Sequence, residues 1–132
     1  MIVLDASAAV ELLLNLPLGA EVRRRLDDPG VQLHAPHLLV VEVLQVLRRR
    51  EAAGTSTHEE VADAVDFLEM LDVTYHDHLL CARRVWELRS NLTAYDATYV
   101  ALAELLDVAL LTSDARLARA PGHHARIDLL PT

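Results

Sequence analysis

The sequence predicts an α/β fold in which helices cover both faces of a central parallel sheet. Short apolar runs with strand character alternate with longer helical patterns along the 132 residues, and this alternation is typical of parallel sheets. The chain shows no internal repeat, linker or low-complexity segment. We therefore predict a single domain over residues 1–132.

Each element is expected from its own local pattern. A long helix is expected from Pro36 until Gly54 stops it, and the next one begins with Thr57 and Glu60 at the spacing of a capping box. The predicted strands cover residues 2–5, 31–34, 73–76, 108–111 and 126–129. The predicted helices cover residues 7–14, 19–26, 36–53, 57–71, 78–88, 94–106 and 115–120.

The charge balance limits the kinds of partner. The chain carries 20 acidic and 12 basic residues, a net charge of −8, and every base is an arginine. This balance argues against general binding to polyanions, which normally requires a basic surface. It does not exclude a nuclease, because bound divalent ions reverse the local field. It also favours a basic protein partner.

The apolar content is high for a domain of this size. Hydrophobic residues make up 52% of the chain, although a small domain exposes a large share of its residues. A partner or a second copy of the chain is therefore expected to cover some apolar surface. The single cysteine, Cys81, excludes an internal disulfide and reads as a small buried hydrophobe. With no evident signal peptide or membrane-spanning run, we expect a soluble cytoplasmic protein without membrane contact.

Four acidic residues interrupt or border apolar segments. Glu42 lies in the middle of the apolar run 38–47, where an unpartnered carboxylate is expensive to bury. Asp5 and Asp114 each follow a predicted strand, and Asp96 begins an apolar helix. Ligands of parallel sheets collect at the carboxyl ends of the strands. The four acids therefore predict one acidic pocket.

Such a pocket has the chemistry of a magnesium site. Magnesium binds carboxylates, water and substrate phosphate, and two such ions can align an attacking water with a phosphodiester. Asp5 and Asp96 are the best candidates for direct ligands, with Glu42 and Asp114 completing the ring or acting through water. Without metal, four converging acids would repel one another.

The same residues also have structural interpretations. Asp5, Asp96 and Asp114 could each cap the helix that follows or contains them, and Glu42 could pair with an arginine. The hydroxyls of Ser7 and Thr112 lie two residues from Asp5 and Asp114. They could orient a ligating carboxylate or serve only as local backbone partners.

Together these motifs resemble the PIN domain, and more narrowly a VapC-type toxin of a bacterial toxin–antitoxin pair. The resemblance rests on Ile-Val-Leu-Asp-Ala-Ser at 2–7, Glu42 in its apolar helix, Leu-Thr-Ala-Tyr-Asp-Ala at 92–97 and Leu-Leu-Thr-Ser-Asp at 110–114. It implies an α/β/α sandwich and an endoribonuclease dependent on Mg²⁺ or Mn²⁺. It also implies homodimerisation and inhibition by a cognate VapB-type antitoxin.

The resemblance also assigns roles to single residues. By position, the family's acidic quartet corresponds to Asp5, Glu42, Asp96 and Asp114, and its accompanying hydroxyls to Ser7 and Thr112. Many relatives carry a further acid shortly after the fourth, where this chain has Arg116. Arg116 could contact phosphate or pair with a pocket acid.

Other functions remain as alternatives. The fold could be a catalytically inert binding module whose pocket holds at most a structural ion. A phospho-acceptor signalling domain also places acids at strand ends, but it needs a lysine and this chain has none. The arginine runs 23–25 and 48–50 could follow an RNA backbone or be solvated helix ends. Trp86 and Tyr99 are expected in the core or at an interface.

Overall fold

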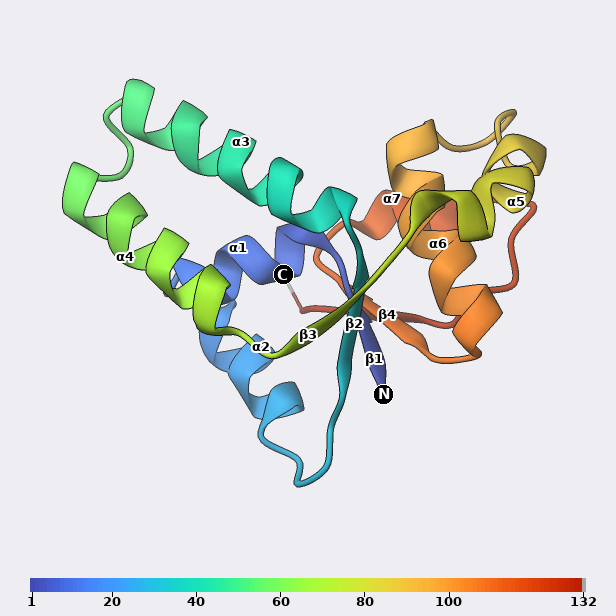
Figure 1. Ribbon diagram of the computed structural model, residues 1–132, viewed down its shortest axis with the longest axis horizontal. Helices are drawn as coiled ribbons and strands as arrows, with labels where there is room; N and C mark the ends of the chain where they lie inside the picture. The colour runs from blue at the N-terminus through green and yellow to red at the C-terminus, as the bar shows by residue number, and fades with distance from the viewer. Residues whose placement is uncertain (132) are drawn as a thin grey trace.

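A parallel sheet of five strands forms the centre of the protein (Figure 1). The computed structural model describes residues 1–131, so Thr132 of the predicted domain lies outside it. The strands follow the order β3-β2-β1-β4-β5, and every neighbouring pair is parallel. Their bounds are β1 Ile2–Leu4, β2 Leu33–Pro36, β3 Val73–His76, β4 Ala109–Thr112 and β5 Ile127–Leu129.

Helices cover both faces of this sheet. Figure 1 shows α1 to α4 on one side and α5 and α6 on the other, with α7 following β4. The predicted three-layer α/β/α sandwich is thereby confirmed. The helix bounds are α1 Ala6–Leu13, α2 Gly19–Leu26, α3 Leu38–Ala52, α4 His58–Met70, α5 Ala82–Glu87, α6 Ala94–Leu106 and α7 Ala115–Arg119, and a 3-10 turn η1, His78–Cys81, precedes α5.

The two central strands carry the core. Val3 and Leu4 of β1 and Leu110 and Leu111 of β4 are completely buried, because a strand covered on both faces has no solvent side. Backbone pairing sets Val3 opposite Leu110 and Leu4 opposite Leu111. The ends of β1 and β4 are therefore held side by side, which brings the residues that follow them to one edge.

Several predicted element bounds differ from the structure, and two of these differences change the kind of element. Pro36 was expected to start a helix, but it is the last residue of β2 and lies opposite His76 of β3. A proline is tolerated where a strand ends because the ladder needs no further N–H from it. The predicted helix 78–88 is divided into η1 and α5, with Cys81 buried at the junction as expected.

Helix α3 is less buried than its composition suggests. Leu39, Val43 and Leu47, spaced four residues apart, face the core. Val41 is 63% exposed and Leu44 is also exposed, so the run 38–47 is not a buried wall throughout. Figure 1 shows why, since α3 and α4 form a hairpin that extends beyond the sheet. Part of the apolar excess noted in the sequence therefore lies on the surface of this hairpin.

The capping box predicted before α4 is present. The Thr57 side chain accepts a hydrogen bond from the Glu60 N–H at 3.1 Å, and Glu60 accepts one from the Thr57 N–H at 2.8 Å. Both orphan donors at the start of the helix are thus satisfied. None of the helices within residues 1–131 has the length and apolar character needed to cross a bilayer.

We expect Thr57→Ala to lower the free energy of unfolding by about 1 kcal/mol, because the substitution removes the cap of α4. Chemical denaturation monitored by circular dichroism measures this change. Thr55→Ala is the matched control, since Thr55 is exposed and its side chain has no hydrogen bond in the described residues. Equal stability of the two variants would contradict a contribution from the cap.

Candidate active site

Asp5 lies at the carboxyl end of β1, buried to 7% exposure. Its Oδ2 atom accepts hydrogen bonds from Ser7 Oγ at 2.8 Å and from Thr112 Oγ1 at 2.5 Å. The side chain makes no capping hydrogen bond to α1, so the capping interpretation of Asp5 is not the one that the structure shows. Two hydroxyls hold the carboxylate in place instead.

The two hydroxyls connect β1 to β4. Ser7 Oγ accepts a hydrogen bond from the Ser113 N–H at 3.0 Å, and Thr112 Oγ1 accepts one from the Asp114 N–H at 3.0 Å. Because each hydroxyl accepts from a backbone N–H, its own proton is free to be donated to Asp5. Ser7 and Thr112 therefore orient Asp5 and also fix the turn that carries Asp114.

Glu42 reaches the same edge from α3 and is half-buried. Its Oε1 atom accepts a hydrogen bond from the Tyr99 hydroxyl at 2.5 Å. Tyr99 lies on α6 and is 1% exposed. The partner of Glu42 is thus a tyrosine and not an arginine. From the sequence, Tyr99 was expected in the core or at an interface, and its hydrogen bond to a pocket acid was not predicted. The available signal is its spacing, since Tyr99 follows Asp96 by three residues and shares its helix face.

Asp96 lies in the first turn of α6. Its backbone N–H donates to Thr93 Oγ1 at 3.1 Å, so Thr93 is the cap of this helix. The Asp96 carboxylate has no hydrogen bond within residues 1–131, which shows that half of the loose capping box is absent. The charged group remains available to the pocket.

Asp114 caps a helix, as one interpretation of the sequence proposed, and it also pairs with an arginine. It caps α7, because its Oδ1 accepts from the Arg116 N–H at 3.0 Å. The Arg116 guanidinium also binds both carboxylate oxygens, with Nη2 2.6 Å from Oδ2 and Nε 3.0 Å from Oδ1. Arg116 Nη2 lies 3.9 Å from Asp96 Oδ2. The expectation that Arg116 could pair with a pocket acid is therefore confirmed.

The charges of three acids act on one another. Burial raises the pKa of Asp5, its two hydroxyl partners oppose this shift, and the charge of Asp96 adds to it. Burial also raises the pKa of Glu42, the Tyr99 hydroxyl opposes it, and both Asp5 and Asp96 raise it further. Arg116 instead lowers the pKa of Asp114. The charge of Asp96 thus adds to the cost of ionising Asp5 and Glu42, whereas Arg116 compensates Asp114.

The donor set fits a hard divalent cation in kind. All the candidate ligands are carboxylate oxygens from separate elements, and Asp5 and Glu42 have no cationic partner within residues 1–131. Within residues 1–131, no three His, Cys, Asp or Glu side chains lie close enough to one another to hold a metal ion as they stand. The residues that would hold an ion are Asp5, Glu42 and Asp96, because burial and neighbouring acids raise the pKa of the first two and a bound cation would offset this repulsion.

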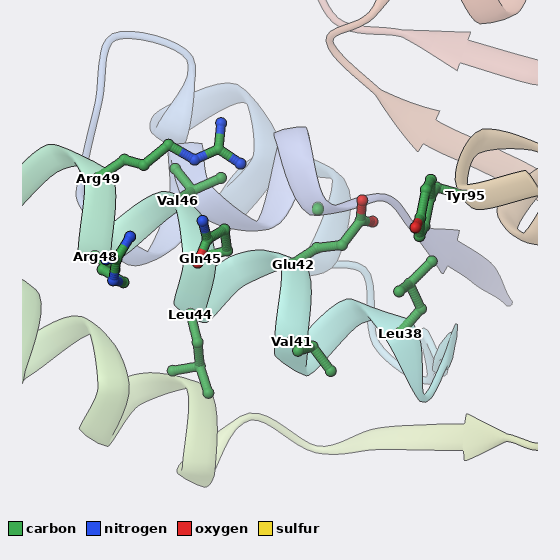
Figure 2. Close-up of a pocket in the computed structure, with 10 residues that line it drawn as sticks. Leu38, Val41, Glu42, Leu44, Gln45, Val46, Arg48, Arg49 and Tyr95 are labelled. Atoms are coloured by element: carbon green, nitrogen blue, oxygen red, sulfur yellow. The ribbon is translucent and has the colours of Figure 1, made fainter. Parts of the chain in front are cut away.

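A groove of about 680 Å³ begins at Glu42 and follows α3 (Figure 2). In Figure 2 the Glu42 carboxylate points toward Tyr95, the residue before Asp96, and Arg48 and Arg49 lie at the other end of the groove. The run 48–50 thus places two arginines at the end of the groove that is remote from Glu42. The run 23–25 is different, because Arg24 and Arg25 pair with Glu21 and Arg25 also binds Asp128 at 2.8 Å.

Comparison with known proteins identifies the family. The sequence profile of the PIN domain matches residues 2–123. The chain belongs to the PIN domain family. Among relatives of this PIN domain, ribonuclease VapC12 of Mycobacterium tuberculosis is 47% identical over 131 residues, which cover 98% of this chain and 99% of the relative. Ribonuclease VapC1 of the same organism is 42% identical, with 97% and 96% covered.

Solved structures show the same fold. The PIN domain described above aligns with Mycobacterium tuberculosis VapC20, a Sarcin-Ricin loop cleaving toxin, with a TM-score of 0.73 at 15% identity, covering 99% of this chain and 100% of that one. It aligns with VapBC2 from Rickettsia felis, bound to a DNA fragment from its promoter, with a TM-score of 0.72 at 15% identity and the same coverage. The resemblance to PIN domains of the VapC type is therefore confirmed.

We expect Asp5→Asn to stabilise the metal-free PIN domain at pH 7.5 by about 1 kcal/mol, because the variant removes a buried, uncompensated charge. A raised pKa means that the contribution of Asp5 to stability is fully present below the ordinary pKa of aspartate. It is lost as the pH rises through the raised value. The advantage of the variant should therefore shrink on acidification, as measured by thermal unfolding with EDTA at several pH values.

The control for this prediction is Asp72→Asn, which neutralises an exposed carboxylate far from β1 in the sheet order. It should not reproduce the pH-dependent difference. An Asp5→Asn variant that is less stable than the native chain at pH 7.5 without metal would contradict the view that Asp5 is a strained charge.

Proposed function

We propose that this PIN domain is an endoribonuclease that uses Mg²⁺ or Mn²⁺ and acts as the toxin of a toxin–antitoxin pair. The observation that carries the proposal is the setting of Asp5, a buried carboxylate that is held by two hydroxyls and whose pKa is raised by burial and by the charge of Asp96. The names of the relatives, ribonucleases at 38–47% identity, support RNA as the substrate. An RNA substrate favours action in the cytoplasm.

The proposed ligands follow from the contacts. Asp5, Glu42 and Asp96 would bind the ion, and Asp114 would complete the ring or act through water. Ser7 and Thr112 hold Asp5 at a fixed orientation, and Tyr99 does the same for Glu42. Such outer partners typically change metal affinity or activity by about 10–100-fold. When bound, a divalent ion supplies a Lewis acid that stabilises negative charge on the phosphodiester.

The chain's own residues would support hydrolysis in two further ways. In this reaction water adds to phosphorus, the P–O bond to the leaving oxygen breaks, and that oxygen takes up a proton. The Tyr99 hydroxyl donates to Glu42 Oε1, which would leave the other carboxylate oxygen of Glu42 oriented toward the ion. Arg116 is exposed beside Asp96 and Asp114 and could bind a phosphate oxygen.

We expect the native chain to cleave RNA in the presence of Mg²⁺ or Mn²⁺ and to lose this activity with EDTA. Asp5→Asn and Asp96→Asn should each reduce cleavage at least 100-fold, because they remove proposed ligands. Gel analysis of cellular RNA and of synthetic oligonucleotides measures the activity, with Asp72→Asn as the exposed control.

The alternatives give different results in this experiment. A binding module would show no metal-dependent cleavage by the native chain, or cleavage that persists unchanged in both Asp→Asn variants. Membership of the PIN family argues against a phospho-acceptor domain, and this chain also lacks the lysine that such a domain needs. Mapping the ends of the products would identify the RNA and the cleavage sequence.

The exposed apolar surface of α3 supports a protein partner. We propose a cognate VapB-type antitoxin and a homodimer, since Val41 and Leu44 leave apolar area on the hairpin that a partner would bury. Co-purification with the product of the neighbouring gene, followed by light scattering, measures both associations. Val41→Asp should weaken one of them about tenfold or more, whereas Leu105→Asp, an exposed leucine on α6, should not. A chain that is strictly monomeric and does not bind the product of the neighbouring gene would contradict both proposed associations.

A further inference from the structure

The Arg116 guanidinium lies over two of the four pocket carboxylates. Its Nη2 atom is 2.6 Å from Asp114 Oδ2 and 3.9 Å from Asp96 Oδ2, and its Nε atom is 3.0 Å from Asp114 Oδ1. The two residues belong to the same short segment, because Asp114 caps α7 and Arg116 lies in its first turn. The chain thus supplies a cation of its own at the exposed edge of the acidic site.

The four pocket acids differ in their contacts with Arg116 and with other partners. Both oxygens of Asp114 accept hydrogen bonds from Arg116, and Oδ1 also accepts the backbone N–H of the same residue. Glu42 uses only Oε1, for Tyr99, and the Asp96 carboxylate has no hydrogen bond within the described residues. Asp5 is held on Oδ2 by neutral hydroxyls. Of these four acids, Asp114 alone has a bidentate, charge-assisted partner within residues 1–131, and this is the strongest kind of such contact.

We propose that Arg116 takes the place of a second metal ion, so that this site binds one divalent cation on Asp5, Glu42 and Asp96 while Asp114 stays with the arginine. The proposal rests on the metal-dependent function proposed above and specifies its metal content.

The position of the guanidinium explains why a second ion is excluded. An ion between Asp96 and Asp114 would have to displace Arg116 from Asp114 and would then lie beside a like charge. A guanidinium remains charged at any pH at which the protein is folded, so the site cannot remove this competitor by losing a proton. Arg116 is mostly exposed, and its Nη1 atom has no partner in the described residues. That face of the guanidinium is open to a phosphate oxygen.

Counting bound Mn²⁺ tests the proposal without relying on activity. Electron paramagnetic resonance and calorimetric titration of the purified chain give the number of ions and their dissociation constants. The variants are Arg116→Gln, which removes the charge, and Arg116→Asp, which adds an acid. Arg119→Gln is the matched control. Arg119 is an exposed arginine on the same helix that acts on Asp114 through its charge but has no hydrogen bond to the pocket acids within residues 1–131.

We expect one Mn²⁺ per native chain and two per Arg116→Asp chain. Arg116→Gln should bind its first ion about tenfold more tightly, because an opposite charge near a carboxylate changes its cation affinity by about this factor or more. Arg119→Gln should bind the same number of ions as the native chain, with a much smaller change in affinity than Arg116→Gln. Two ions on the native chain, or Arg116 variants that behave like Arg119→Gln, would overturn the inference. If RNA cleavage still required metal and Asp5, the proposed function would stand. A native chain that binds no Mn²⁺ would instead reject both.

Discussion

The burial of Asp5 between two hydroxyls is the constraint on which the rest of this site depends. A carboxylate at the end of a central strand cannot move away from the sheet, because β1 is paired with β2 and β4 on its two sides. Ser7 and Thr112 hold it from two different elements. The pairing of β1 with β4 is therefore also what assembles the site. Glu42 and Asp96 then bring further negative charge to a position where it is already unfavourable.

Much of this arrangement is visible in the sequence. Asp5 and Asp114 follow apolar runs that alternate with helices, and in a parallel sheet the ends of neighbouring strands lie at one edge. Ser7 and Thr112 each lie two residues from one of these acids, so a search for hydroxyls near the acids in the sequence identifies them. The order of strands and helices along the chain can also be predicted from local patterns, because each element has its own hydrophobic periodicity.

Contacts between distant elements are what the sequence does not supply. The Tyr99–Glu42 hydrogen bond joins α6 to α3, and only the spacing of Tyr99 from Asp96 hints at it. Exposure of Val41 and Leu44 depends on how far the α3–α4 hairpin extends beyond the sheet, and composition does not record this. Pro36 shows the same limit, because its place in β2 is decided by pairing with β3 and overrides its preference for helix starts.

The distance along the chain between Asp5 and Thr112 has a consequence for protein synthesis. A growing polypeptide that has been translated through α3 contains Asp5 and Glu42, but it has neither β4 nor the second hydroxyl. Its Asp5 carboxylate therefore cannot yet be held by both hydroxyls. A ribosome that makes this protein is therefore not exposed to a functional nuclease until residues beyond 112 have been added and have left the exit tunnel.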